Sequence, residues 1–204
     1  RISQMPSSYI NPEYPYRHSP DQDAQVPTHH PVIIAGGGPA GLAAAMDLAQ
    51  QGVRTVVLDD NNTVSVGSRA ICIAKRTLEI CDRYGCGQAM LDKGVTWHLG
   101  KVYFGEDQIY EFNLLPEEDH KVPAFINLQQ YYMEEYMVKR CMEIPEIELR
   151  WLHKVTAVNT DDTGAVVTVH TSEGDYTLTC DYLLVADGAN SHIRSSLGLE
   201  SKGQ

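Results

Sequence analysis

The order of apolar and polar residues from Val32 to Leu58 predicts a strand, a helix and a second strand. Val32 to Ala35 form a continuous apolar run typical of a buried parallel strand. After three glycines, apolar residues recur at helical spacing at Leu42, Ala45, Met46 and Ala49. Gly52 is placed to end this helix, and Thr55 to Leu58 form a second apolar run. The pattern predicts one strand, glycine turn, helix and strand unit of an α/β fold.

Two further helices are expected in the middle of the chain. One is Ser68 to Gly85, with Ile73, Leu78 and Ile80 on its apolar face. The other is Asn127 to Glu143, whose apolar face carries Met133, Met137 and Cys141. Between them, extended segments are expected from Val95 to Phe112, with turns at Gly100 and Gly105.

The chain after Pro145 has the pattern of successive strands. Turn signals fall at Asp161 to Gly164 and at Ser172 to Gly174. The last run, Tyr182 to Ala186, is apolar enough to return to a buried parallel sheet. Residues 1–30, in contrast, are rich in proline and tyrosine and lack periodicity, which predicts an extended arm that is ordered only if its tyrosines dock on another surface.

Charge and composition narrow the classes of function. The net charge is −11 over 204 residues, without a cluster of basic residues, which argues against a nucleic-acid partner. No apolar stretch approaches the roughly 20 residues of a membrane span, and the first thirty residues do not resemble a secretory signal. The five cysteines include no C-x-x-C pair, so we expect reduced thiols, no metal site and a cytoplasmic protein.

The glycine-rich turn has the G-x-G-x-x-G spacing of a dinucleotide-binding loop. Gly36 makes the tight turn, Gly38 lets the backbone approach a pyrophosphate, and Gly41 lets the helix pack on the sheet, with Pro39 and Ala40 between them. The pyrophosphate is expected at the positive helix N-terminus.

An acidic pair ends the second predicted strand. Asp59 lies at about the 20-residue offset at which a carboxylate accepts hydrogen bonds from ribose hydroxyls. Its neighbour Asp60 is the weaker candidate, because adjacent strand residues point to opposite faces. An acid here disfavours the 2′-phosphate of NADP, which leaves NAD or the adenosine half of FAD.

A second motif follows the last apolar run, in "YLLVADGANSHIRSSLG". Asp187 and Gly188 end the strand, and Ser191 and Arg194 follow within the next turn. These groups suit either a polar ligand above a sheet edge or a capped surface helix.

Together the two motifs resemble the flavin-dependent aromatic hydroxylases related to p-hydroxybenzoate hydroxylase, which share a D-G-x-x-S-x-x-R pattern. The branch that looks most similar contains the 3-(3-hydroxyphenyl)propionate and phenol hydroxylases. The resemblance covers Pro31 to about Gly198. It implies a Rossmann-like, GR2-type FAD-binding domain, with a parallel central sheet and an antiparallel β-meander. The domain would span residues 31–204, include part of a substrate-domain insertion near residues 95–125, and end before a Gly-Asp fingerprint, so that the substrate domain is incomplete.

The same resemblance implies roles for further residues. Arg69 would meet the FAD, and Gln130, or Gln129 in a register shifted by one, would contact it from the start of a helix. Val155 would lie near the adenine through its backbone, and Asp187 near the flavin and pyrophosphate. Ordinary structural roles stay open for all of them, and Ser191 and Arg194 are alternatively residues that stabilise the Asp-Gly turn.

The activity that the resemblance implies is hydroxylation of a phenolic or other aromatic substrate. NAD(P)H would reduce FAD, and O₂ would react through a flavin hydroperoxide. The sequence leaves open the substrate, the choice of NADH or NADPH, and the phenol base, for which His98, His120, His153 and the tyrosines are candidates only in principle. Another FAD-dependent oxidoreductase, such as a dehydrogenase, epoxidase or halogenase, and a noncatalytic dinucleotide-binding module are the alternatives. A homodimer is common among similar enzymes, but the oligomeric state is also open.

Overall fold

A six-stranded sheet organises the N- and C-terminal parts of the chain. The computed structural model describes residues 9–67, 69–117, 119–200 and 202–203. The chain divides into two compact units, one of residues 1–66 with 141–204 and one of residues 67–140.

The sheet belongs to the first unit, and its strands run in the order β8-β2-β1-β11-β10-β9. The strands are β1 (Thr28–Ala35), β2 (Thr55–Asp59), β8 (Ile147–Trp151), β9 (Lys154–Asp161), β10 (Gly164–Thr171) and β11 (Gly174–Val185). The pairs β8–β2, β2–β1 and β1–β11 are parallel, whereas β11–β10 and β10–β9 are antiparallel. The predicted combination of a parallel sheet with an antiparallel meander is therefore confirmed.

β11 joins the two halves of the sheet. Its residues Gly174 to Cys180 pair with β10, and its residues Leu178 to Val185 pair with β1. The predicted parallel pairing of Tyr182 to Ala186 is confirmed for Tyr182 to Val185, but Tyr182 is 71% exposed and this stretch is less buried than its composition indicates.

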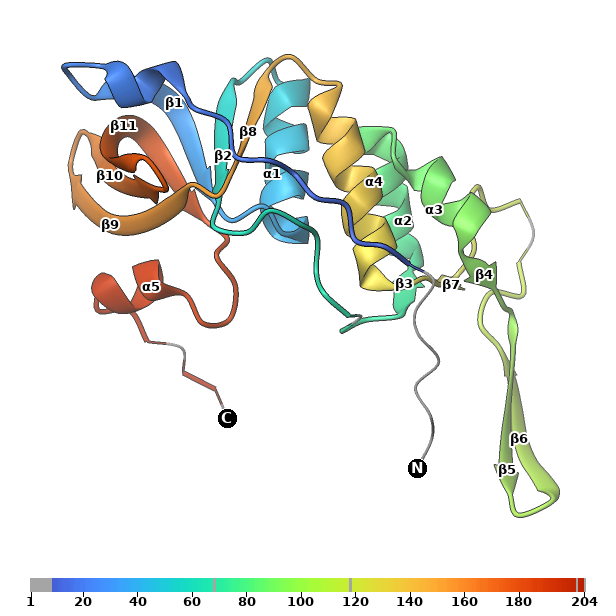
Figure 1. Ribbon diagram of the computed structural model, residues 1–204. Helices are drawn as coiled ribbons and strands as arrows, with labels where there is room; N and C mark the ends of the chain where they lie inside the picture. The colour runs from blue at the N-terminus through green and yellow to red at the C-terminus, as the bar shows by residue number, and fades with distance from the viewer. Residues whose placement is uncertain (1–8, 68, 118, 201, 204) are drawn as a thin grey trace. The chain divides into compact units, whose positions relative to one another are not determined.

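The two faces of β1 are both covered, which explains its continuous apolar run. Helix α1 (Pro39–Gln50) lies beside β1, β2 and β8, as Figure 1 shows. On the other face, alternate residues of the parallel and antiparallel strands form one buried cluster with Ile193 of α5 (His192–Ser196). This cluster contains Ile33, Ala35, Val56, Leu58, Val158, Ala165, Val167, Val169, Tyr176, Leu178, Cys180 and Ile193. The predicted stop at Gly52 is confirmed, because Gly52 follows α1 with a φ of 74°.

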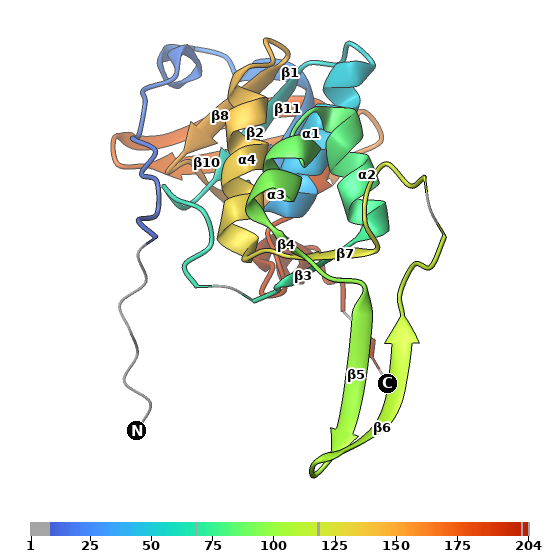
Figure 2. The same cartoon turned by 90° about the vertical axis from the view of Figure 1, so that its right-hand side faces the viewer.

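The second unit contains short strands, helices and a hairpin. Its elements are β3 (Cys72–Ala74), α2 (Lys75–Tyr84), α3 (Gly87–Lys93), β4 (Val95–Thr96), β5 (Leu99–Phe104), β6 (Asp107–Asn113) and β7 (Phe125–Asn127), followed by α4 (Gln130–Met142), which ends in the first unit. The hairpin of β5 and β6 extends away from α2 and α3 in Figure 2.

Three predictions for this unit are wrong in detail. The helix expected from Asn127 begins at Gln130, because Asn127 lies on β7 and pairs with β3 and β4. The helix expected from Ser68 begins at Lys75, and Ile73 lies on β3, because that segment pairs with β7; Ser68 itself lies outside the described residues. Gly100 is inside β5, opposite Phe112, whereas the predicted turn at Gly105 is confirmed.

The N-terminal arm docks on the first unit. Residues 1–8 lie outside the described part, and from Tyr9 the chain leads to a short 3₁₀ helix, η1 (Pro20–Asp23). Tyr14 stacks on Trp151 and Tyr16 stacks on His153. The N-terminal arm was expected to be ordered only if its tyrosines dock on another surface, and these two contacts are that docking. The following strand begins at Thr28, earlier than expected.

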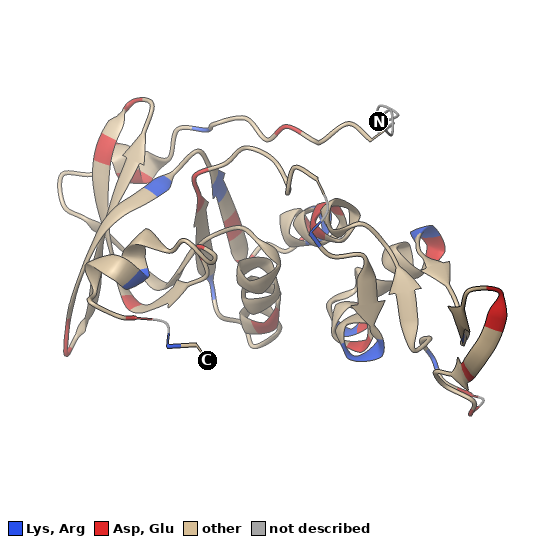
Figure 3. Ribbon diagram, turned by 90° about the horizontal axis from the view of Figure 1, so that it is seen from below, with Lys and Arg blue, Asp and Glu red and all other residues tan. Residues whose placement is uncertain are grey.

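The Lys and Arg residues of the described chain are scattered over separate elements in Figure 3. All five cysteines are free, with Cys72 exposed and the others buried. Among the described residues, no helix has the length and apolar character needed to cross a membrane, and no three or more His, Cys, Asp or Glu side chains form a group suited to a metal ion.

Candidate cofactor-binding site

The glycine loop, Asp59 and the Asp187 turn meet at the carboxyl ends of three neighbouring strands of the first unit. β1 lies between β2 and β11, and the glycine loop leaves its end. Gly36 N–H donates to the Leu58 carbonyl at 2.8 Å, and Ala186 N–H donates to the Ala35 carbonyl at 2.7 Å. These bonds hold the loop between the ends of β2 and β11, the place where α/β sheets bind dinucleotides.

The three motif glycines serve different purposes. Gly36 has a φ of 111°, and a Cβ there would lie 2.3 Å from the Ala186 carbonyl oxygen. A Cβ on Gly41 would lie 1.9 Å from the Gly36 carbonyl oxygen. Gly38, the N-cap of α1, has nothing within 4 Å of such an atom. Gly36 and Gly41 are therefore required by packing, whereas the space at Gly38 can admit a phosphate group.

Asp59 connects the end of β2 to the glycine loop. Its Oδ2 accepts a hydrogen bond from Gly37 N–H at 2.5 Å, and its Oδ1 accepts one from Asn61 N–H at 2.7 Å. A carboxylate has about four acceptor positions, so both oxygens can accept further donors. Asp59 thus has the geometry of a group that binds hydroxyls beside the loop.

Burial raises the pKa of the Asp59 carboxyl group, and the hydrogen bonds from Asn61 and Gly37 oppose that rise. A carboxylate that is short of solvent gains from additional donors, such as the two hydroxyls of a ribose. The open space at Gly38, the helix N-terminus and this carboxylate together fit the adenosine diphosphate half of FAD.

The Asp-Gly motif forms a turn directly after β11. Gly188 has a φ of 85°, and Ser191 N–H donates to its carbonyl at 3.2 Å. Ser191 Oγ accepts from Arg194 N–H at 3.0 Å, and Arg194 Nη2 donates to the Ala189 carbonyl at 3.0 Å. Ser191 and Arg194 therefore stabilise the turn. Asp187 follows Ala186, whose N–H is bound to the end of β1, and its Oδ2 accepts a hydrogen bond from Ile193 N–H at 3.5 Å.

The remaining predicted ligands have different surroundings. Asp60 is exposed and accepts from Asn61 Nδ2 at 2.9 Å. Val155 lies on β9, two residues after His153, whose N–H donates to the Asp59 carbonyl at 2.8 Å. The start of β9 is thus next to the end of β2.

Arg69, Gln129 and Gln130 belong to the second unit. Arg69 is exposed. Gln130 opens α4, and its Nε2 donates to the buried Glu134 at 2.6 Å, while the Gln129 carbonyl accepts from Tyr132 N–H at 3.1 Å. Their roles toward a cofactor stay predictions.

Two residues of the site were missed by sequence reasoning. Gly37 occupies a variable position of the motif, yet its N–H binds Asp59. Asn61 closes a turn over the same carboxylate, and the polar run "DDNN" after an apolar strand is the available signal.

The three histidines differ in burial. His153 is fully buried, between the Tyr176 hydroxyl at 2.8 Å from Nδ1 and the Arg17 carbonyl at 3.1 Å from Nε2. Because a carbonyl only accepts, Nε2 carries the proton, and the ring has a structural role. His120 contacts Lys75 Nζ at 2.7 Å, and His98 is exposed.

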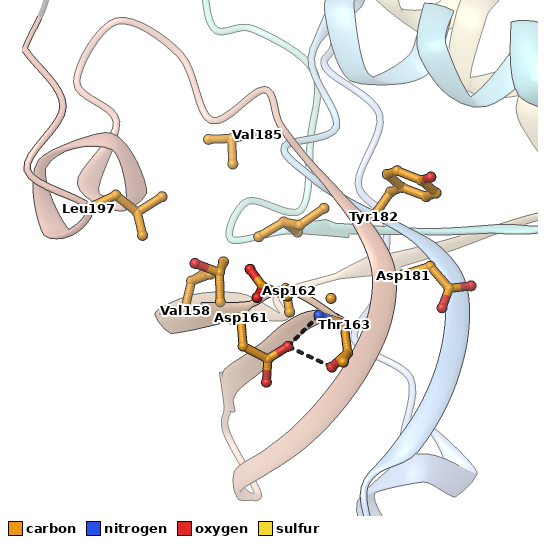
Figure 4. A pocket seen from close by; sticks show the side chains of 12 residues that line it. Val158, Asp161, Asp162, Thr163, Asp181, Tyr182, Val185 and Leu197 are labelled. Carbon is orange, nitrogen blue, oxygen red and sulfur yellow. Dashed lines mark hydrogen bonds between the residues drawn. The ribbon is translucent and has the colours of Figure 1, made fainter.

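A separate pocket of about 670 Å³ lies beside β11, on the side away from β1. Figure 4 shows Tyr182, Val185 and Leu197 around it, with Asp161 bound to Thr163. Asp161, Asp162 and Asp181 also line it. Three carboxylates are unsuited to a pyrophosphate, so the glycine loop remains the candidate site.

The fold and the site define a dinucleotide-binding domain of the flavoprotein type. The chain belongs to the FAD binding domain family, whose profile matches residues 29–204. The resemblance to FAD-dependent aromatic hydroxylases is confirmed by its relatives.

One relative is the para-nitrophenol 4-monooxygenase of Pseudomonas sp. strain WBC-3, with 31% identity over 84% of this chain and 43% of the relative. Another is the 12-dehydrotetracycline 5-monooxygenase/anhydrotetracycline 6-monooxygenase of Streptomyces rimosus, with 33% identity over 85% of this chain and 33% of the relative. The crystal structure of p-nitrophenol 4-monooxygenase PnpA from Pseudomonas putida DLL-E4 matches with a TM-score of 0.80 and 28% identity, over 88% of this chain and 46% of that one. The chain thus spans less than half the length of these relatives.

Proposed function

We propose that this chain is the FAD-binding part of a flavin-dependent monooxygenase that hydroxylates a phenolic or other aromatic substrate with O₂ and NAD(P)H. The convergence of the glycine loop, Asp59 and the Asp187 turn at one sheet edge carries the proposal. The two relatives are named as monooxygenases, and one of them is named for a nitrophenol.

In this proposal each group of the first unit has a distinct task. Gly38 and the N-terminus of α1 hold the pyrophosphate, Asp59 binds the adenosine ribose, and Asp187 approaches the pyrophosphate and flavin. Val155 borders the adenine through its backbone. When bound, the flavin supplies the oxygen chemistry, and the protein supplies binding, orientation and exclusion of water.

The second unit contributes Arg69 and Gln129 or Gln130 as further FAD contacts. We also propose that the segment near residues 95–125 belongs to a substrate-binding region, that the protein is cytoplasmic, and that it forms a homodimer. The five free thiols support the cytoplasmic assignment. The resemblance to similar enzymes supports the dimer.

Neutral variants of two neighbouring acidic residues test the cofactor site. Asp59→Asn removes the charge that the ribose hydroxyls bind, so FAD is expected to bind at least about tenfold more weakly. Asp60→Asn removes the same charge from the adjacent exposed position and is expected to bind FAD like the parent chain. Binding is measured by quenching of flavin fluorescence on titration, and equal affinity of all three proteins would contradict the role of Asp59.

The activity is tested on the natural protein that carries this chain. We expect a yellow protein with flavin absorbance, NAD(P)H oxidation that a phenol accelerates, and a hydroxylated product identified by mass spectrometry. A colourless protein that binds NAD instead would show a dinucleotide-binding module, and flavin without any product from a broad panel of phenols would show a different oxidoreductase.

A further inference from the structure

The segment Tyr9 to Arg17, called the arm below, passes the end of β8 in Figures 1 and 2. Its anchor is Tyr14, which is only 9% exposed and whose ring stacks on Trp151 with centroids 4.5 Å apart and an angle of 17°. A second ring, Tyr16, stacks on His153 at 5.2 Å. The arm is thus fixed by aromatic contacts with the last residue of β8 and with His153, between β8 and β9.

The arm also binds the loop that follows Asp59. Tyr14 N–H donates to the Asn62 carbonyl at 2.7 Å. Asn11 Nδ2 donates to the carbonyls of Val64 and Ser65, each at 3.2 Å. Residues 60–66 form neither helix nor strand, so these bonds from the arm replace the backbone pairing that a regular element would supply.

This loop is continuous with the cofactor-binding carboxylate. Asn61, next to Asn62, donates its N–H to Asp59 Oδ1, and its carbonyl accepts from Leu152 N–H at 3.2 Å. Trp151, on which Tyr14 stacks, is the register partner of Asp59 in the β2–β8 pair. The arm therefore holds both the loop after Asp59 and the strand residue beside it.

We propose that the arm is a positioning element for the adenosine end of the FAD site, with Tyr14 as its principal positioning residue. This inference rests on the proposed FAD-binding function. A loop that is ordered before the ligand arrives loses less conformational freedom on binding, so docking of the arm increases affinity without contact between the arm and the ligand.

The test measures ADP binding by calorimetry to the natural protein that carries this chain, after removal of its flavin, because ADP contains only the part of FAD that this end would hold. Tyr14→Ala removes the stacked ring, and ADP is expected to bind about five- to tenfold more weakly. Tyr14→Phe keeps the ring and is expected to retain most of the affinity. Asn11→Ala removes only the two side-chain bonds and is expected to weaken ADP binding about two- to threefold.

His18→Ala is the matched control within the same N-terminal segment. Its ring contacts Glu173 and Asp23, away from the loop after Asp59, so ADP affinity is expected to be that of the parent. Hydrogen exchange across residues 60–66 supplies a second readout, which should accelerate in Tyr14→Ala and Asn11→Ala but not in His18→Ala.

The outcomes separate the two proposals. If the parent binds ADP or FAD and all arm variants bind equally well, the positioning role is overturned and the cofactor site stands. If the parent binds neither, the cofactor site fails and the inference with it. If Tyr14→Ala does not fold, Asn11→Ala decides, since an unchanged affinity and exchange rate in that variant overturns the proposal.

Discussion

At the scale of single residues, Gly36 and Gly38 separate folding from binding within one motif. Gly36→Ala places a methyl group 2.3 Å from a carbonyl oxygen at a φ of 111°. The free energy of unfolding is expected to fall by roughly 2 kcal/mol or more. Gly38→Ala meets open space, so stability should stay near that of the parent while FAD affinity falls at least about tenfold, because the methyl group occupies the phosphate position.

Urea denaturation and flavin titration check this pair of glycine variants together. The interpretation fails if Gly38→Ala unfolds as easily as Gly36→Ala, or if Gly38→Ala binds FAD normally. Gly52→Ala, at a left-handed position outside the loop, controls for backbone strain alone.

At the scale of elements, buried polar side chains connect β8, β11 and η1. Arg150 of β8, whose side chain is 5% exposed, donates to the Tyr176 hydroxyl at 3.2 Å and to Asp21 at 2.6 Å. The Tyr176 hydroxyl in turn binds His153. Tyr176→Phe leaves both partners buried without it, and the free energy of unfolding is expected to fall by about 1–3 kcal/mol.

Tyr182→Phe is the matched control for this network, because Tyr182 lies on the same strand with its side chain largely exposed. It is expected to unfold at the same urea concentration as the parent. An equal loss of stability in the two variants would show that the network contributes nothing specific.

At the scale of the whole molecule, we expect stability to fall when His153 is protonated. Burial lowers the pKa of His153, and the charge of Arg150 lowers it further, against the hydrogen bond to Arg17 and the charges of Glu148 and Glu173. The unfolded chain therefore takes up this proton first, so stability is present above about pH 6.5 and is lost as the pH falls through the folded pKa.

A second group, Asp21, is expected to cause a further loss of stability at lower pH. Burial of Asp21 favours its protonated form, but hydrogen bonds from His30 and Arg150 lower its pKa overall, so its stabilising contribution is lost as the pH falls through that lowered value. The pKa of exposed His18 is raised by Asp23 and Glu173, which opposes the trend weakly.

Urea midpoints from pH 7.5 to 5 measure the effect, which we expect as a fall toward pH 5 in the parent and as a smaller fall in His153→Gln. An identical slope in the two proteins would assign the pH dependence to other groups.

The sequence by itself determined the local parts of this protein. The strand, glycine loop and helix from Val32 to Gln50 follow from apolar periodicity and glycine spacing, which depend on neighbours along the chain. The motif at Asp187 was recognisable for the same reason. Together they were sufficient to indicate an FAD-binding domain.

The tertiary structure decided what depends on residues far apart in sequence. Ile73 lies on a three-residue strand because β7 pairs with it, and Gly100 is a strand residue because Phe112 lies opposite. Asp59 takes its environment from Gly37 and Asn61, and the arm takes its order from Trp151 and His153. Apolar periodicity carries no information about such contacts, since the free energy that selects them appears only when the partners meet.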